Sequence, residues 1–499
     1  MATADLPANT AEIDATVPLK SRIIHKFYEP LVLRKALSQA SQNRARHVSS
    51  EPIDMGNLQQ LSFALVYKIA HVCDDVKGES GASVTSFAVL QSHGNTSTVQ
   101  YWFASNQRTH EQLEGTKTFI RDLLRLFQTT NREPLELVSM HRTALRHVLQ
   151  FNKPRLKFYL ETLGMHLRQC LAQSLDGETG RNHTISRALE GLLQPQIFPD
   201  ASEESEDQFV RGCEIMIDEL LRLQTSRAGL LIIDRSKEGR MPGHTSQECW
   251  SELQHTISRI IAYHYSVQCM IRAREEWPAL FENFEVHFIP SSTPMERFKR
   301  NKSLSADGIV GRMTRKVKVI EQFRRYVETL QGFDLDQRIV SEYQNPSFRP
   351  VVHSEVLLLD WLKNSGRLTP EHFFNGWMYI GTSKPPCTLC QYYFEEHQSG
   401  VAHRPSHGNL YINWRLPDVL VSQGPAAEND RQVMLDRVLN RIRKDTFDLV
   451  KKKVPFTYKE HDSNTFSPPL THGTWTSDQK STRILNDAAL QMGQLSLSD

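Results

Sequence analysis

The sequence predicts an α/β domain joined to a large, mostly α-helical region, and three observations support this fold class. Short helical and strand patterns alternate from residue 351 onward. A helical pattern and a β-hairpin pattern precede residue 107, far from that part of the chain. Residues 109–270 show almost only helical patterns. With 499 residues and 39% hydrophobic content, the chain is long enough to bury two or three domains' worth of core.

The first predicted elements are a helix and a hairpin. From Asn57, apolar residues recur at spacings of three and four, which predicts a helix with one buried face. The runs SVTSFAVLQS and TSTVQYWFAS then follow, separated by a short segment that contains Gly94. Because both runs are rich in β-branched and aromatic residues, they predict a β-hairpin around this turn.

The remaining elements follow from similar patterns. Thr109 and Gln112 have the spacing of a helical capping box, and FEVHFIP at 284–290 alternates like an isolated strand. Further on, the patterns predict a helix in HSEVLLLDWL, a strand in GWMYI, a helix after PPC and a strand in NLYINW. A long charged helix at roughly 430–453 closes the ordered part.

The composition limits where the protein acts. Residues 1–20 and 458–499 lack sustained periodicity and are predicted to be disordered tails. The first twenty residues do not resemble a signal peptide, and no apolar run approaches the ~18 residues of a membrane span. Seven cysteines form a sparse, odd set, which indicates a reducing compartment, cytoplasmic or nuclear.

The charge pattern leaves the partner open. A formal net charge of +2 does not indicate nucleic-acid binding by itself. Residues 297–325, however, hold ten Lys and Arg side chains. They predict either a solvated helix face or a surface that contacts phosphate groups. The sequence does not predict an oligomeric state.

Two short motifs stand out from this background. The stretch PPCTLC at residues 385–390 places two cysteines three apart behind a proline, and HSE at 353–355 lies upstream. About one His-x-Glu is expected by chance in a chain of this composition, so this motif alone is weak. Pro-Cys-x-x-Cys is expected on the order of 0.005 times, so it is the stronger signal.

The residue types in these motifs suit a catalytic zinc site. Two thiolates and one imidazole, from Cys387, Cys390 and His353, make three ligands and leave the fourth tetrahedral position to a water whose pKa the metal lowers towards ~7. Glu355 is not needed as a ligand, so it can take the water's proton and pass it to a leaving amine. Since residues two apart diverge by roughly 200° on a helix, His353 and Glu355 can share a site only at a helix start.

At these residues the sequence resembles the zinc-dependent cytidine deaminase-like superfamily, whose signature is His-x-Glu followed by Pro-Cys-x-x-Cys. SKPPCTLC and NLYINW are similar to a mainly fungal branch of nucleic acid or nucleotide deaminases. The resemblance covers about residues 351–414. It implies Zn²⁺ bound by His353, Cys387 and Cys390, with Glu355 as the proton shuttle. It also implies a cytosine or adenine base as substrate, in a nucleoside, a nucleotide or single-stranded nucleic acid.

The resemblance also has consequences for the rest of the fold. In this superfamily a helix and two antiparallel strands precede the His-x-Glu helix, and an asparagine after the second strand contacts the sugar. The segment directly before HSE lacks these elements, but the helix from Asn57 and its hairpin have the expected order. The resemblance therefore assigns substrate binding to Asn106, with its side chain in the same pocket as the metal.

We accordingly predict a three-layer α/β/α cytidine deaminase-like domain built from residues 21–107 and 345–457. Residues 108–344 are expected to form a mostly α-helical insertion or an additional helical domain, which loop-closure entropy permits. In this arrangement the strand at 98–104 lies in one sheet with residues 377–380. The alternative is a separate N-terminal helical domain with its own hairpin.

Other interpretations of the motif remain open at this stage. A structural zinc finger would use the C-x2-C-x12-H-x3-H spacing of Cys387, Cys390, His403 and His407. Pro405 opposes it, because proline inside the required helix costs ~3 kcal/mol. The two cysteines could instead form a redox pair or simply be buried. Finally, the protein could be an inactive deaminase-like scaffold, although a purely structural site would not need Glu355.

Overall fold

The computed structural model describes residues 15–40, 44–46, 54, 56–76, 81–92, 98–128, 134–175, 180–200, 202, 205–238, 248–297, 304–452 and 458–460. Most of the two predicted tails and residues 298–303 of the basic stretch lie outside these residues. Within the first predicted tail, Thr16 forms an antiparallel bridge with Leu420. At the other end, β7 (Tyr458–Glu460) pairs in parallel with β1 (Arg44–Arg46).

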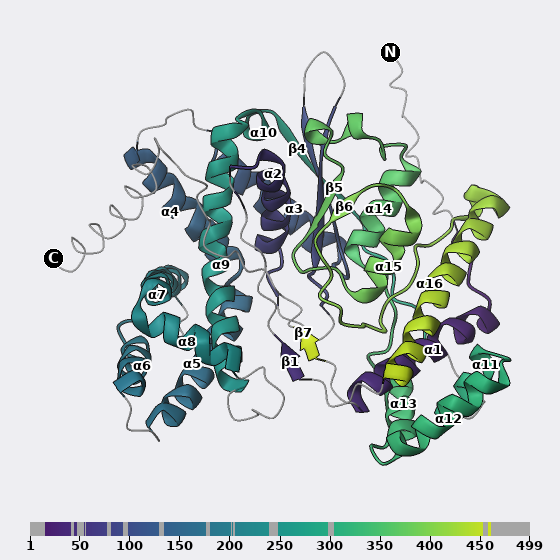
Figure 1. Cartoon of the computed structure of the whole chain (residues 1–499). Helices are drawn as coiled ribbons and strands as arrows, with labels where there is room; N and C mark the ends of the chain where they lie inside the picture. The colour runs from purple at the N-terminus through teal and green to yellow at the C-terminus, as the bar shows by residue number, and fades with distance from the viewer. Residues whose placement is uncertain are drawn as a thin grey trace, which may run out of the picture.

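Strands from distant parts of the chain form one mixed sheet (Figure 1). Among the described residues it has five strands in the order β4-β3-β2-β5-β6. These are β2 (Thr85–Gln91), β3 (Val99–Ser105), β4 (Phe284–Ile289), β5 (Tyr379–Thr382) and β6 (Ala402–His403). β2 pairs antiparallel with both β3 and β5, while β4 and β6 pair in parallel with β3 and β5. The expected hairpin therefore shares a sheet with the strand that precedes the PCxxC motif.

Alternate residues of the central strand point to opposite faces of this sheet, as the two-residue strand period requires. Phe87 and Val89 join one hydrophobic core, and Ala88 and Leu90 join the other. The first core contains α2 (Leu58–Val72) and the helices that follow the hairpin. The second contains α14 (Ser354–Asn364), α15 (Thr388–His397) and α16 (Gly424–Lys452). Helices thus cover both faces, which confirms the predicted α/β fold with a large helical region.

Most of the helical region packs on the α2 face of the sheet. Its helices are α3 (His110–Arg125), α4 (Pro134–Phe151), α5 (Lys153–Leu175), α6 (Gly180–Leu192), α7 (Glu206–Thr225), α8 (Arg227–Glu238), α9 (Glu248–Glu276) and α10 (Ala279–Glu282). The predicted capping box begins α3, since Thr109 and Gln112 each accept a hydrogen bond from the other's backbone N–H. The long helix α9 lies along α2, α5 and α8 and forms the centre of this core.

The segment 108–344 is divided between the two faces. β4 joins the sheet beside β3, as the pattern of a strand at 284–290 predicts. The helices after β4 pack with α1 (Ser21–Ala40) and α16 on the opposite side, in the core of α14 and α15. They are α11 (Ala306–Met313), α12 (Val317–Gln331) and α13 (Leu335–Gln344). The segment is therefore mostly helical, but its parts lie on different sides of the sheet.

The prediction of a strand in NLYINW is wrong. Among residues 409–414 the structure has only one bridge, in which Trp414 pairs with Val351. The start of this segment instead contacts the first residue of α15: the backbone carbonyl of Asn409 accepts a hydrogen bond from Thr388 N at 3.0 Å. Trp414 is fully buried and stacks near Phe27, so its apolar neighbours reflect packing in the core. No helix among the described residues is both long and apolar enough to cross a bilayer.

Candidate metal centre and active site

The HSE motif lies at the start of α14, as the geometry of the proposed site requires. His353 is the N-cap residue, with extended backbone angles (φ −69°, ψ 149°), and Glu355 belongs to the first turn. Within a regular helix, residues two apart point in very different directions. Because His353 precedes the helix, this does not apply to it, and its side chain can lie on the same side as that of Glu355. Leucines and valine of α14 fill the core and fix this helix against β2 and β3.

The PCxxC motif lies at the start of a second helix, α15. Cys387 is its N-cap residue (φ −75°, ψ 169°), and Cys390 lies in the first turn. Pro386 therefore precedes the cap and lies outside the helix. Its carbonyl accepts hydrogen bonds from Ser406 Oγ (2.8 Å) and His407 N (3.3 Å), which fix the approach to the helix. Both cysteines are buried at a helix N-terminus, where the dipole favours a thiolate.

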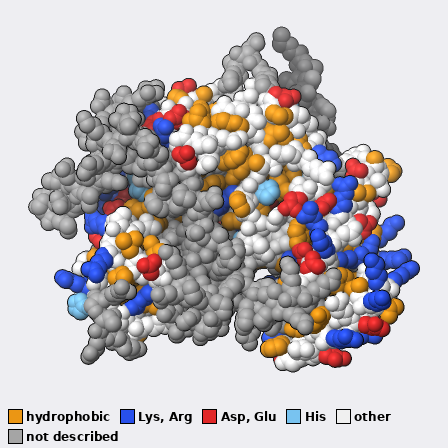
Figure 2. All heavy atoms as spheres, viewed as in Figure 1, with side chains coloured by type: hydrophobic (Ala, Val, Ile, Leu, Met, Phe, Trp, Pro, Cys, Tyr) orange, Lys and Arg blue, Asp and Glu red, His pale blue; other side chains and the backbone are white. Residues whose placement is uncertain are grey.

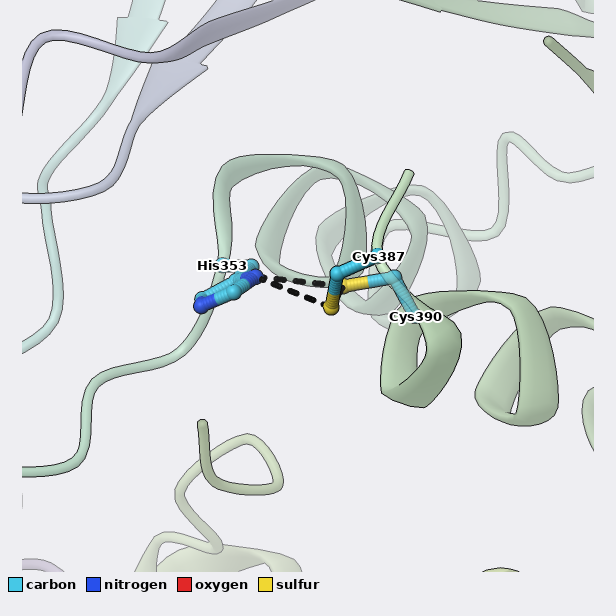
Figure 3. Close-up of side chains that lie close together, drawn as sticks. All are labelled: His353, Cys387 and Cys390. Atoms are coloured by element: carbon cyan, nitrogen blue, oxygen red, sulfur yellow. Dashed lines mark hydrogen bonds between the residues drawn. The ribbon is translucent and has the colours of Figure 1, made fainter. Parts of the chain in front are cut away.

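The two helix starts bring His353, Cys387 and Cys390 together (Figure 3). His353 Nδ1 lies 3.7 Å from Cys387 Sγ and 3.3 Å from Cys390 Sγ, and the two sulfurs are 3.6 Å apart. Ligands at usual zinc distances on a tetrahedron are about 3.6–3.8 Å apart. Two sulfurs and one imidazole nitrogen are also donors that zinc prefers. The three side chains thus fit a metal ion, and within the described residues they form the group able to hold one.

The zinc-finger alternative is not formed. Neither His403 nor His407 belongs to the metal-competent group among the described residues. His403 Nδ1 contacts the carbonyl of Arg404 at 2.7 Å, and His407 Nδ1 accepts a hydrogen bond from Asn409 N at 2.9 Å. His407 is buried rather than exposed, because the segment that contains it packs against the start of α15.

The electrostatics of the cluster favour a bound cation. Burial raises the pKa of both thiols, but the Cys390 S–H and the His353 ring hold the pKa of Cys387 well below its usual range. Burial and the neighbouring Cys387 thiolate hold the pKa of Cys390 well above its usual range. Burial lowers the pKa of His353, yet the Cys387 thiolate outweighs this and raises it overall. Two thiolates at this separation therefore need a positive ion between them before both can ionise.

Glu355 lies beside the cluster without being part of it. Its side chain is buried, with 4% of the residue exposed, and it accepts a hydrogen bond from Ser354 Oγ at 3.4 Å. A carboxylate in the first turn of α14 is stabilised by the helix dipole. It is thus held in the helix start that carries His353, and it does not belong to the metal-competent group among the described residues.

Asn106 follows β3 and contacts the start of α14. Its Oδ1 accepts a hydrogen bond from Ser354 N at 2.8 Å, and its Nδ2 donates one to the carbonyl of Gly81 at 3.0 Å. Because Ser354 lies between His353 and Glu355, this contact ties Asn106 to the backbone between these two residues. The resemblance assigned Asn106 a contact with a sugar, which stays a prediction; the contact that the structure shows is the one with Ser354.

Sequence reasoning missed two serines of the site. Ser86 of β2 and Ser354 of α14 are both buried, and their hydroxyl oxygens share a hydrogen bond of 2.7 Å. The signal that could have revealed them is the period of β2, where Ser86 and Ala88 are small residues on the same face. A small polar residue on a buried strand face indicates a polar partner close above it.

Comparison with known proteins agrees with this geometry. Residues 352–418 match the model of a family described as OTT_1508-like deaminase, and this range contains His353, Glu355, Cys387 and Cys390. No curated protein and no solved structure matches the chain. The matched family, the two motifs and the α/β architecture agree with one another. Residues 352–418 of this chain are thus similar to a deaminase family, which supports a relation to the cytidine deaminase-like superfamily.

Proposed function

We propose that this protein is a zinc-dependent hydrolytic deaminase that removes the exocyclic amine from a cytosine or adenine base. The base would be part of a nucleoside, a nucleotide or a nucleic acid. The observation that supports this most is the convergence of His353, Cys387 and Cys390 at two helix starts, with Glu355 beside them. The family match over the same residues supports the reaction class.

Each residue of the site would have a separate role. His353, Cys387 and Cys390 would hold the zinc ion, which supplies Lewis acidity and an activated water when bound. Glu355 would accept a proton from the nucleophile and deliver it to the leaving amine, and its burial keeps that proton from bulk solvent. Asn106 has two N–H bonds on Nδ2, and the carbonyl of Gly81 takes one of them. The other would bind the substrate's sugar.

The basic stretch 297–325 would contact the phosphates of a nucleotide or single-stranded nucleic acid. Figure 2 shows Lys and Arg side chains gathered on the side of the molecule where Figure 1 places α11, α12 and α16. Two basic residues of the stretch have carboxylate partners: Arg312 pairs with Glu29 and Arg324 with Asp307, both at 2.6 Å. The exposed side chains that would meet phosphate are Arg315, Lys316, Lys318 and Arg325.

An intracellular location, cytoplasmic or nuclear, belongs to the same proposal. All seven cysteines lie within the described residues, and none of them is in a disulfide bond. Free thiols are usual in proteins of a reducing compartment.

The proposal is tested by measuring zinc content together with a mass-spectrometric screen for deamination. The substrates are cytidine, adenosine, their phosphates and single-stranded oligonucleotides. We expect about one zinc per chain and loss of the amine from one of these substrates. Glu355→Ala should keep the metal and lose turnover, and activity that survives in this variant would remove the proposed mechanism. Zinc binding without turnover of any substrate would instead favour an inactive scaffold.

A further inference from the structure

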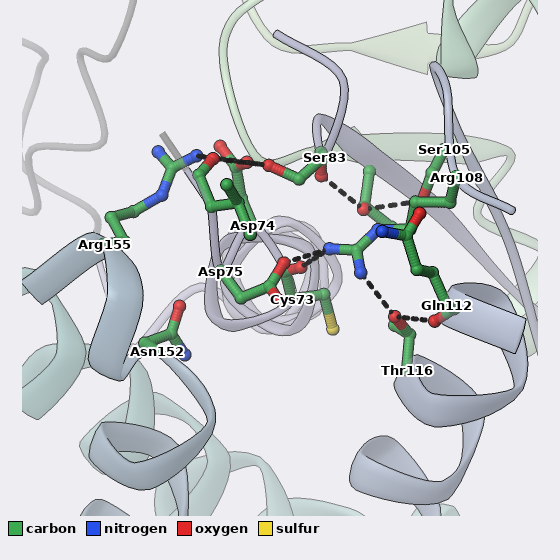
Figure 4. A network of polar contacts seen from close by, with 12 residues as sticks. Cys73, Asp74, Asp75, Ser83, Ser105, Arg108, Gln112, Thr116, Asn152 and Arg155 are labelled. Carbon is green, nitrogen blue, oxygen red and sulfur yellow. Dashed lines mark hydrogen bonds and ion pairs between the residues drawn. The ribbon is translucent and has the colours of Figure 1, made fainter. Parts of the chain in front are cut away.

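Two arginines from the helical region hold the end of α2 (Figure 4). Arg155 of α5 forms an ion pair with Asp74, in which Nη2 and Oδ1 are 2.5 Å apart. Arg108, just before α3, pairs with Asp75 and donates to the carbonyl of Cys73 at 2.6 Å. The side chains of Arg155 and Asp74 are only 5% and 3% exposed. Breaking such a buried pair leaves an uncompensated charge, so the pair holds Arg155 and Asp74 firmly in place.

Asp74 connects this pair to the loop before β2. Ser83 Oγ donates to Asp74 Oδ1 at 2.6 Å, and Arg155 Nη2 lies 3.3 Å from the same hydroxyl. The guanidinium also donates from Nη1 to Tyr159 OH at 3.1 Å. One planar fork therefore contacts the carboxylate, the serine and the tyrosine at once, in a fixed geometry that the flexible ammonium group of a lysine does not provide.

The same loop fixes Asn106. Backbone N–H groups of Asn106 and Gln107 donate to the carbonyls of Val84 (3.0 Å) and Ala82 (2.9 Å), and Asn106 Nδ2 donates to Gly81. The other end of the Asn106 amide accepts from Ser354 N at the start of α14. A displacement of the loop therefore moves the group that orients the peptide between His353 and Glu355.

We propose that Arg155 is a positioning residue for the candidate active site. It acts through Asp74, Ser83 and the loop 81–84 on Asn106, and through Asn106 on the start of α14. The inference rests on the proposed function of that site, and it gives the helical region a part in the chemistry. Removal of Arg155 or of the Ser83 hydroxyl changes the orientation of His353, and with it the geometry of a bound metal.

The test uses the full-length chain loaded with Co²⁺ in place of zinc. The visible absorption bands report the coordination geometry, and competition with a chelator gives the dissociation constant. Asn106→Ala should weaken Co²⁺ binding by about 10-fold to 100-fold, the range for partners of metal ligands. Arg155→Gln and Ser83→Ala should shift the same bands and weaken binding by about 3-fold to 10-fold.

Two matched controls isolate the effect. Arg274→Gln removes a buried arginine of α9 that donates to the carbonyl of Phe127 at 2.9 Å. Ser266→Ala removes a buried hydroxyl of α9 that donates to the carbonyl of Ala262 at 2.8 Å. Both should leave the bands and the dissociation constant within about twofold of the wild type, because neither contacts the loop 81–84 among the described contacts.

The outcomes separate this inference from the proposed function. If Ser83→Ala and Arg155→Gln match their controls in spectrum and affinity, the positioning role is refuted, whatever the activity. If Arg155→Gln does not fold, Ser83→Ala alone decides, since it removes a single oxygen atom. Wild-type protein that binds Co²⁺ through the three ligands but deaminates no substrate refutes the function and leaves the positioning result intact. Failure of the wild type to bind Co²⁺ overturns both.

Discussion

The two faces of the sheet use side chains of very different size. Towards the helical region, Phe87 and Phe103 are paired across β2 and β3 and fill a wide apolar layer. Towards the site, Ser86 and Ala88 are small, and α14 lies close enough for the Ser86 hydroxyl to reach Ser354 at 2.7 Å. One sheet thus supports bulk packing on one side and close polar contacts on the other. Substitutions on the two faces should therefore separate stability from metal binding.

The largest expected effect is on the site face. Cys387→Ser should weaken zinc binding by at least about 1,000-fold, because it removes one of the three proposed ligands, and should also lower stability when metal is present. Zinc content after gel filtration and the thermal midpoint with and without a chelator measure the two effects. Glu355→Ala is the comparison, since it should keep zinc. If the two variants give the same zinc content and the same thermal midpoints, the assignment of Cys387 as a ligand and of Glu355 as the proton shuttle is wrong.

Apolar packing residues of the opposite face, unlike Arg155, should respond in stability alone. Phe103 is fully buried between Phe87 and Phe288, so Phe103→Ala should lower the free energy of unfolding by about 3–5 kcal/mol. Denaturant unfolding checks this. The zinc content of the folded variant should equal that of the wild type, and a loss of zinc in native protein would show that the two faces are not separable.

Lys68 of α2 allows a pH test of the helical-region face. Burial lowers the pKa of its ammonium group from 10.5 to about 7, and among the described residues its Nζ has no hydrogen-bond partner. The unfolded chain therefore binds more protons than the folded one between about pH 7 and pH 10.5, so folded stability rises with pH across this window. Lys68→Met should raise the free energy of unfolding by about 2–4 kcal/mol at pH 7, and the gain should fade towards pH 10.5.

Denaturant unfolding at pH 7, 8.5 and 10 measures this gain. The control is Lys117→Met on α3, where the side chain is 35% exposed and the same substitution should have an effect of under about 0.5 kcal/mol. A gain that does not depend on pH would mean that Lys68 is not kept neutral by burial.

The smallest expected effect concerns the contact of α2 with β5. A Cβ atom on Gly381 would lie 2.6 Å from the backbone nitrogen of Tyr67, closer than real contacts allow. Gly381→Ala should therefore lower the free energy of unfolding by about 1–3 kcal/mol. Gly191→Ala is the matched control, because beyond its chain neighbours and its own helix backbone the added Cβ would meet no described atom within 4 Å, and it should be neutral or stabilising by up to ~1 kcal/mol. If the two substitutions change the free energy of unfolding equally, α2 moves away from the added methyl group at little cost.

Chemistry was easier to predict from this sequence than long-range packing. The three side chains that the structure brings together could be named because few residue types bind zinc, and Pro-Cys-x-x-Cys is rare by chance. The hairpin and the strand at 284–290 were visible in their alternation. The pairing of β3 with β4 was not, since it joins in parallel two segments about 180 residues apart and leaves no local pattern.

One prediction failed where buried apolar residues alternate along the sequence without forming a strand. NLYINW has the apolar alternation of a strand, yet its Trp414 is buried by packing against α1 while its backbone serves the start of α15. Arg155 was missed for a different reason. A single arginine in an amphipathic helix looks solvated, and only the fold shows that it faces Asp74 in the interior.

The central place of β2 has a consequence for the synthesis of the protein. Its partner β3 is made almost at once, but β5 leaves the ribosome about 280 residues later, roughly 15–60 s at usual rates of translation. During that time one edge of β2 presents unpaired N–H and C=O groups, to which strands of other chains can add. Nascent chains that stop before residue 379 are therefore expected to aggregate. The yield of folded protein should depend on how fast this stretch is translated and on chaperones that cover the unpaired edge of β2.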